Sequence, residues 1–190
     1  MKKIKNIFLA SNSPRRKAIF SFLGIDFNVL KIDADESFQG TDPSEICIEI
    51  CRKKLSAAKK LLEPKDLEES LVVVADTLVF YENKPLGKPK SRNEARQMLR
   101  LLSGQSHKVI TAIGFSELGL DDFFYDVTDV RFIELNDGMI NYYLDQNNFL
   151  DKAGAYGIQS EDCFFVESIQ GSFSNVVGFP IELFRSKIKL

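Results

Sequence analysis

The sequence has few of the residues that usually carry metal sites and disulfides. It contains three cysteines, one histidine and no tryptophan in 190 residues. Cys47, Cys51 and Cys163 are odd in number and lack metal-site spacing, so we expect free thiols in a reducing compartment. His107 has no second histidine with which to share a metal, which favours a structural role.

Net charge and long apolar runs are also lacking. The chain carries 25 basic and 27 acidic residues, so no global field draws it to nucleic acid or to an anionic membrane. No apolar run approaches the roughly 20 residues of a membrane span. The Met1-Lys2-Lys3 start lacks the apolar core of a signal peptide. We therefore expect a cytoplasmic protein without nucleic-acid or membrane partners, in which any anion site is local.

The remaining composition indicates one domain over residues 1–190. Apolar residues make up 44% of the chain and aromatic residues 11%, enough for one sizeable core or for one core split into two lobes. Helix and strand patterns alternate, which predicts an α/β fold with a mixed central sheet. The expected elements are a strand over 7–10, helices over 14–24 and 43–62, a strand over 71–75 ended by Asp76, a hairpin near 82–84, a helix over 91–104, strands over 109–115 and 124–135, a helix over 136–147, a strand over 163–167 and a helix from Pro180.

The segment from Ser11 to Arg16 is the first candidate for anion binding. Ser13 can cap a helix that begins at Pro14, and Arg15 and Arg16 lie in its first turn. Backbone N–H groups and the helix dipole favour phosphate there, and guanidinium groups add bidentate contacts. A serine cap followed by surface arginines is also an ordinary helix start, so this segment alone leaves both interpretations open.

Asp76 is the candidate for the chemistry. It follows the apolar run 71–75, so we expect its carboxylate at the end of a buried strand, where α/β sheets place their sites. It could bind a divalent metal, accept a proton from water, or merely cap the next turn. Asp33, Asp35 and Glu36 follow the first helix. One of them could share a metal with Asp76, although a solvated loop is the other interpretation of each.

Two lysines and one loop complete the candidates. Lys54 falls on the apolar line of the second helix, and an inward lysine needs an anionic partner or a route to water. Lys88 lies on a Gly-Lys-Pro turn that can hold a charge in place, although loop lysines are usually just solvated. The loop 152–159 is rich in glycine and ends on Gln159, whose amide both donates and accepts. It could let a flat base approach, or simply connect a helix to a strand.

Together these segments resemble the Maf family of nucleotide pyrophosphatases. They occur in the family's order and cover nearly the whole chain. The matching segments are LASNSPRR at 9–16, ADT at 75–77, LGKP at 86–89, LSGQSH at 102–107 with Val109 and Thr111, KAGAYGIQ at 152–159 and GSFSNVVGFP at 171–180.

The resemblance implies a two-lobed α/β fold like that of inosine triphosphate pyrophosphatases, with a cleft between the lobes. It implies metal-dependent release of pyrophosphate from a nucleoside triphosphate, with Mg, Mn or Co as the divalent cation. A homodimer is suggested by the family alone. Carried over by position, Asp76 would accept a proton or bind the metal, and Glu36 would bind the metal. The residues that would contact phosphates are Ser11, Arg15, Lys54 and Lys88, and those that would bear on substrate choice are Arg16, Thr77 and Gln159.

Within the family, residues 155–159 resemble the subgroup that acts on dTTP and UTP. The chain departs from the usual pattern at Ser160, where glycine is normal, and at Phe179, where leucine is common. Two alternatives stay open: a 7-methyl-GTP pyrophosphatase, and a nucleotide-sensing regulator of septum formation. The intact Asp76 favours an enzyme over a sensor.

Overall fold

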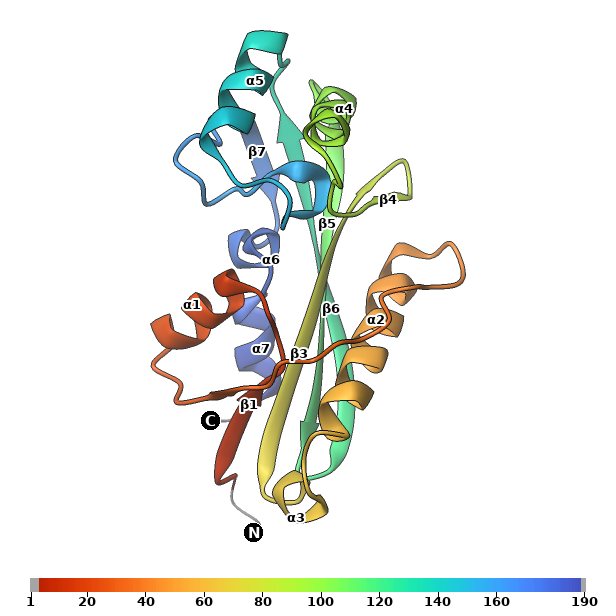
Figure 1. The fold of residues 1–190 in the computed structure, drawn as a ribbon, viewed down its shortest axis with the longest axis vertical. Coiled ribbons are helices and arrows are strands. Elements are labelled where there is room, and N and C mark those ends of the chain that lie inside the picture. Colours follow the sequence, from red (N-terminus) through yellow and green to blue (C-terminus); the bar gives the residue numbers. More distant parts are fainter. Residues whose placement is uncertain (1–3, 189–190) are drawn as a thin grey trace. The chain divides into compact units, whose positions relative to one another are not determined.

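The structure, a computed structural model, describes residues 4–188 (Figure 1); Met1 to Lys3 lie outside the described residues. The chain divides into two compact units. Unit 1 consists of Met1–Asp76 with Thr111–Tyr125, and unit 2 consists of Thr77–Ile110 with Asp126–Leu190. The elements of the first half are β1 (Asn6–Leu9), α1 (Pro14–Phe22), β2 (Asn28–Val29), α2 (Pro43–Lys59), α3 (Pro64–Leu67), β3 (Ser70–Tyr81), β4 (Lys84–Leu86) and α4 (Arg92–Leu102). Those of the second half are β5 (Ser106–Glu117), β6 (Leu120–Phe132), α5 (Asp137–Gln146), the short 3-10 helix η1 (Ala153–Ala155), β7 (Val166–Gln170), α6 (Phe173–Val177) and α7 (Ile181–Lys187).

The described strands form a mixed sheet of seven strands in the order β2-β1-β3-β5-β6-β7, with β4 paired to β3. β1 runs parallel to β2 and to β3, whereas β4 and β7 run antiparallel to β3 and β6. The expected α/β fold with a mixed sheet is therefore confirmed. The hairpin between β3 and β4 is also confirmed. Glu82 and Asn83 have φ values of +48° and +61°, which suit a two-residue turn whose twist matches the strands.

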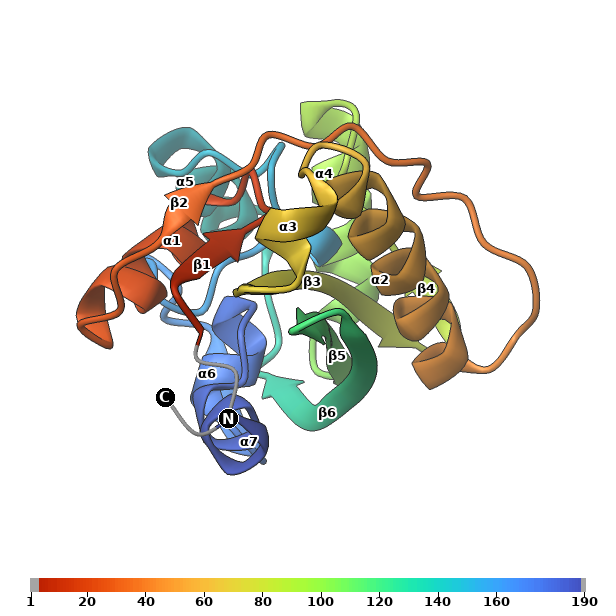
Figure 2. The ribbon, with the colours of Figure 1, turned by 90° about the horizontal axis from the view of Figure 1, so that it is seen from below.

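Unit 1 contains the buried first half of β3 and the apolar face of α2. Every residue from Ser70 to Asp76 is buried, as expected for a central strand. Cys47 and Cys51 lie one turn apart on the inner face of α2 as free, buried thiols. The Cys51 thiol donates to the Ala112 carbonyl of β5 at 3.3 Å, so α2 packs on the sheet. Figure 2 shows β1 beside β2, which is the parallel pair of this unit.

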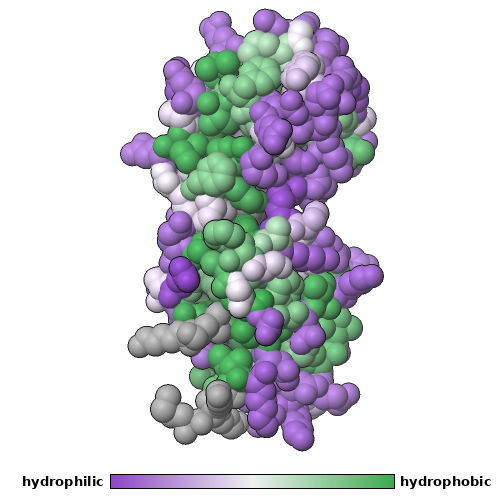
Figure 3. Space-filling view, turned by 90° about the vertical axis from the view of Figure 1, so that its left-hand side faces the viewer, coloured by the Kyte–Doolittle hydropathy of each residue, from purple (hydrophilic) through white to green (hydrophobic). Residues whose placement is uncertain are grey.

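Unit 2 contains an aromatic core. α4, which shows the clearest apolar stripe of the chain, packs against α5 and η1. Phe132, Tyr143, Tyr156 and Phe165 are buried together with edge-to-face ring contacts, such as the 4.9 Å separation of the Phe132 and Phe165 rings. Large apolar side chains also reach the surface, where Figure 3 shows them interspersed with polar ones. No described helix has the length and apolar composition needed to cross a membrane.

Most expected helix starts are confirmed by their caps. The side chains of Asp42, Ser91 and Asn136 accept hydrogen bonds from backbone N–H groups of the first turns of α2, α4 and α5. Pro14 begins α1 as predicted, but the Ser13 hydroxyl makes no capping bond. α2 ends at Lys59 rather than near residue 62, because Pro64 opens a separate turn, α3.

The prediction that Asp76 ends its strand was wrong. β3 continues to Tyr81, because Thr77, Val79 and Phe80 favour extended backbone and the β4 hairpin pairs with this half. What ends near Asp76 is the parallel pairing, since the last β1 partner of β3 is Val73. β7 begins at Val166, three residues later than predicted, and α6 within 171–180 was not foreseen.

Candidate active site

The loop between β1 and α1 places Ser11 against Arg16. The Ser11 hydroxyl accepts from the Ser13 backbone N–H at 3.2 Å and from Arg16 Nη1 at 3.4 Å. Ser11 and Arg16 are both buried, whereas Arg15 is half-buried. The Ser11 hydroxyl therefore fixes the start of α1. It also holds the Arg16 guanidinium in the first turn, where phosphate binding is favoured.

Asp76 lies opposite Lys54 of α2. The Lys54 ammonium is 2.5 Å from Asp76 Oδ1 and 2.8 Å from Glu36 Oε1. The Lys54 and Asp76 side chains are only 11% and 10% exposed, whereas Glu36 is 50% exposed. The sequence prediction that Lys54 points inward is confirmed, and its anionic partners are the two carboxylates that were expected to share a metal.

The charges of this group are strongly coupled. Burial lowers the pKa of the Lys54 ammonium, but the charge of Asp76 and hydrogen bonds to Asp76 and Glu36 outweigh it, so the pKa is raised overall. Burial lowers the pKa of the Arg16 guanidinium, while the charges of Asp76 and Glu36 act in the opposite direction. Guanidinium groups keep their proton in proteins, and the pKa of Lys54 is raised. Unit 1 therefore offers two buried positive charges beside one buried carboxylate.

The other acidic residues after the first helix do not join this group. Asp35 accepts from the backbone and hydroxyl of Ser37 and from Lys53. The hydrogen bonds from Ser37 and, to a smaller extent, the one from Lys53 lower the pKa of Asp35 to about 2. Asp33 is exposed. Of the three, only Glu36 reaches Lys54.

Thr77, Lys88 and Gln159 belong to unit 2. The Thr77 hydroxyl, next in the chain to Asp76, donates to the Gly178 carbonyl at 3.4 Å. Lys88 is exposed and follows Gly87, whose carbonyl accepts from Gly154 N–H at 3.1 Å. The turn of Lys88 is therefore hydrogen-bonded to the loop 152–159.

Gln159 ends that loop beside a glycine and a lysine. It is exposed, and a Cβ added at Gly157 would lie 2.9 Å from Gln159 Nε2 and 2.8 Å from Lys152 Cε. Lys152 is buried and bonded to Asp151 and to the Asn148 carbonyl. Sequence reasoning did not single out Lys152, although it opens the glycine-rich segment. The structure thus brings Ser11, Arg16, Lys54, Glu36 and Asp76 together in unit 1, and groups the Lys88 turn with Gln159 in unit 2.

The segment 171–180, one of those that resemble the family pattern, has a structural role. Asn175 is fully buried, and its amide donates to the Val109 carbonyl at 3.0 Å and to Thr128 Oγ1 at 2.9 Å. Gly171 has a φ of +132°, and a Cβ there would lie 2.7 Å from Thr128 Oγ1. This network secures α6 and with it Gly178, the partner of Thr77.

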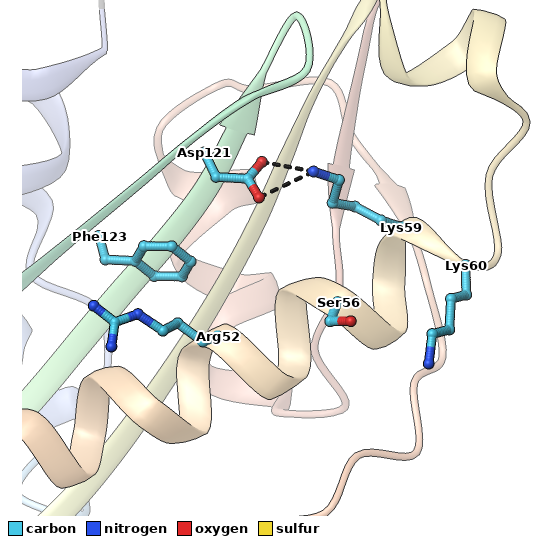
Figure 4. A pocket seen from close by; sticks show the side chains of 6 residues that line it. All are labelled: Arg52, Ser56, Lys59, Lys60, Asp121 and Phe123. Atoms are coloured by element: carbon cyan, nitrogen blue, oxygen red, sulfur yellow. Dashed lines mark hydrogen bonds and ion pairs between the residues drawn. The ribbon is translucent and has the colours of Figure 1, made fainter.

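A hollow of about 500 Å³ is lined by side chains from the second half of α2 and the residue after it, and by Asp121 and Phe123 of β6 (Figure 4). Lys54 is not among its lining residues. Two of its three cationic side chains have partners within the hollow. Lys59 bonds to Asp121 at 2.8 Å, and the Arg52 guanidinium lies 5.5 Å from the centre of the Phe123 ring. No buried carboxylate lines it, so the hollow lacks the groups that the expected chemistry needs.

Two carboxylates of this group are available to a divalent metal. Within residues 4–188, no three His, Cys, Asp or Glu side chains gather closely enough to hold a metal alone. Glu36 and Asp76 nevertheless converge on one point, which Lys54 Nζ now contacts. Mg²⁺ commonly uses one or two carboxylates together with water and substrate phosphates. These two residues therefore suit a metal that arrives with a triphosphate.

Comparison with known proteins identifies the family. The family model described as "Maf-like protein" matches residues 6–189. This chain belongs to the Maf family. A relative from Bacteroides fragilis, named dTTP/UTP pyrophosphatase, is 45% identical over 96% of this chain and 94% of its own. Relatives with the same name from Thermotoga petrophila and Bacillus cereus are 43% and 37% identical, covering 92% and 98% of this chain and 84% and 90% of their own.

One solved structure resembles this Maf chain more distantly. The Staphylococcus aureus Ham1 protein is 18% identical, with a TM-score of 0.49 over 67% of this chain and 72% of that one. That likeness is too weak to carry a conclusion. The Maf assignment stands on the family match and on the relatives.

Proposed function

We propose that this chain hydrolyses nucleoside triphosphates between the α and β phosphates, giving the monophosphate and pyrophosphate, with dTTP and UTP as preferred substrates. The observation that carries the proposal is the buried Asp76 carboxylate at 2.5 Å from the Lys54 ammonium, beside Arg16 and Ser11. The names of relatives that are 37–45% identical over nearly the whole chain support the same activity.

The cations suit a polyphosphate. A triphosphate at neutral pH carries about four negative charges, which fixed cations can stabilise as charge moves to the leaving group. Arg15, Arg16, Lys54 and Lys88 supply four positive charges. When the triphosphate arrives, Lys54 exchanges a carboxylate for a phosphate oxygen, and this exchange frees Asp76 for the reaction.

In the proposed reaction, water attacks the α-phosphorus in line with the bond to the β-phosphate oxygen. Asp76 orients that water and accepts its proton. The new bond joins the water oxygen to the α-phosphorus, and the broken bond releases pyrophosphate. If Asp76 instead acts chiefly as a metal ligand, raising the metal concentration should partly restore activity in Asp76→Asn; this outcome would assign it that role.

Glu36 and Asp76 are the residues proposed to hold a divalent cation, with Mg, Mn or Co as candidates. Such an ion neutralises phosphate charge and acidifies bound water. Chelation with EDTA should therefore abolish pyrophosphate release, and added metal should restore it. Glu36→Gln should raise the metal concentration needed for half-maximal activity, with Glu45→Gln as a control on an exposed residue outside the group.

A pyrophosphate-release screen tests the activity and the base preference together. We expect the highest kcat/KM for dTTP and UTP among common, methylated and oxidised nucleoside triphosphates. A preference for 7-methyl-GTP would overturn the assigned base. Nucleotide binding without turnover in Mg, Mn and Co would favour the sensor over the enzyme.

A further inference from the structure

The loop 152–159 is held in an unusual backbone conformation. Gly154 and Ala155 both have a φ of +67°. For Ala155, which is fully buried, this is a left-handed conformation that an L side chain adopts only where its surroundings impose it. Gly154 packs so closely that a Cβ would lie 3.0 Å from Val79 Cγ2. The loop therefore depends on contacts that hold it.

Three buried polar side chains supply such contacts. The Tyr143 hydroxyl of α5 accepts from the Gly157 N–H at 3.0 Å. The Tyr156 hydroxyl is 2.8 Å from His107 Nε2 of β5. His107 and Tyr156 are 3% and 5% exposed. The loop is thus tied to α5 at one point and to β5 at another.

These bonds are not a requirement of the core. Phe132 and Phe165 fill the same cluster without polar atoms. Polar groups cost free energy to bury even when they are paired, and His107 Nδ1 has no partner within the described residues. Burial lowers the pKa of His107 to about 4, so the imidazole is neutral at pH 7. What the polar pairs add is a fixed direction for the loop.

We propose that Tyr143 and His107 are positioning residues that fix the backbone of the loop 152–159, and thereby aim the Gln159 amide at the nucleobase. The contact that transmits their effect is at Gly157. Its N–H is held by Tyr143, and its missing side chain leaves the space in which Gln159 Nε2 and Lys152 Cε lie. The inference rests on the proposed function for its substrate, a pyrimidine nucleotide, and it concerns base discrimination rather than phosphate cleavage.

Hydroxyl deletions test the proposal with a matched control. Tyr143→Phe leaves the Gly157 N–H unpaired, and Tyr156→Phe removes the partner of His107. Tyr142→Phe is the control, because Tyr142 is the neighbouring residue of α5, is 51% exposed, and its hydroxyl donates to the Asp162 carboxylate at 3.3 Å rather than to the loop. We expect both test variants to lower kcat/KM for dTTP about three- to tenfold, because each loses one hydrogen bond. The loss should appear as a higher KM. The kcat/KM for ATP should stay the same, and Tyr142→Phe should behave as the parent.

Gly157→Ala tests the same contact without removing a hydrogen bond. Gly157 does not have a positive φ, and the atoms that a Cβ would meet are the ends of two flexible side chains. The variant should therefore fold, displace Gln159 and lower the ratio of dTTP to ATP hydrolysis in the same way. An equal loss of kcat/KM on every triphosphate, or no loss on any, would overturn the proposal.

Amide hydrogen exchange separates this proposal from the proposed function. In Tyr143→Phe, the Gly157 amide should exchange faster than in the parent, while the core amides of β5 keep their protection. Unchanged exchange at Gly157 would refute the positioning role. If the parent protein released no pyrophosphate from any triphosphate, the proposed function would fail, and the exchange measurement would still decide whether Tyr143 holds the loop.

Discussion

Lys54 and Asp76 show how a buried charge is tolerated at the scale of single residues. Each side chain is about one-tenth exposed, and a buried ion loses hydration that only a close opposite charge can replace. Removing either one deprives the other of its closest opposite charge, although Glu36 still faces Lys54 and the charge of Arg16 still acts on Asp76. The pair therefore contributes less to folding stability than two well-packed apolar residues would. It does hold a carboxylate beside a site that receives phosphate.

His107 gives a prediction about pH. Burial lowers its pKa from 6.5 to about 4, with the charge of Asp129 acting weakly in the opposite direction. Between these values the unfolded chain binds the proton and the folded chain does not. The free energy of unfolding therefore falls as the pH drops from about 6.5 towards 4. By about pH 5 this penalty should reach roughly 2 kcal/mol.

Urea unfolding of the parent and of His107→Gln at about pH 7.5 and pH 5 measures this effect. The glutamine can keep a hydrogen bond to Tyr156 but cannot be protonated. The parent should lose about 2 kcal/mol more than the variant on acidification. Equal losses would show that His107 keeps an ordinary pKa in the folded protein.

At the scale of elements, the β3–β4 hairpin combines a favourable turn with one unfavourable residue. Asn83 tolerates the left-handed conformation that both turn positions require, whereas Glu82, at φ +48°, does so poorly. Glu82→Asn should raise the free energy of unfolding by about 0.5–1 kcal/mol. Thermal unfolding would detect this as a higher Tm.

The control for this turn is Glu161→Asn. It makes the same exchange and removes the same charge, but at a residue that is not among those with positive φ. Glu161→Asn should leave Tm nearly unchanged. Equal shifts in the two variants would attribute the gain to charge rather than to the backbone.

The elements differ in how far the sequence predicted them. The sequence predicted α4 well, because its N-terminal cap, its apolar stripe and its terminal glycine all indicate the same helix. The course of β3 beyond Asp76 was not clear, because local sequence marks a polar residue after an apolar run as an end. The continuation depends on pairing with β4. α6 is held by the Asn175 and Thr128 bonds, and such tertiary partners are not visible in a single sequence.

The whole molecule consists of two compact units that share three strands. β3, β5 and β6 each contribute residues to both units, so neither unit is a continuous stretch of chain. We therefore predict one cooperative unfolding transition, as proposed for a single domain over residues 1–190. Calorimetry and far-ultraviolet circular dichroism should give coincident midpoints, and two separated transitions would contradict this.

The candidate site was predictable in its composition and only partly in its geometry. Helix periodicity indicated that Lys54 points inward, and the apolar run 71–75 indicated a buried position for Asp76. That the two meet, with Glu36 as a third member, requires α2 to pack against the sheet at one particular register. The hydrogen bond between His107 and Tyr156 joins residues 49 positions apart, and no local pattern predicts such a pair.

Pyrophosphate release by Asp76→Asn tests most directly whether Asp76 carries the reaction. The assay uses dTTP as substrate, with the divalent metal that restores activity after EDTA treatment. We expect a loss of at least about a hundredfold in kcat, in a protein that still unfolds cooperatively. Asp121→Asn, which removes an exposed carboxylate paired with Lys59, should keep the activity of the parent. Equal turnover by Asp76→Asn and Asp121→Asn would show that Asp76 takes no part in the reaction.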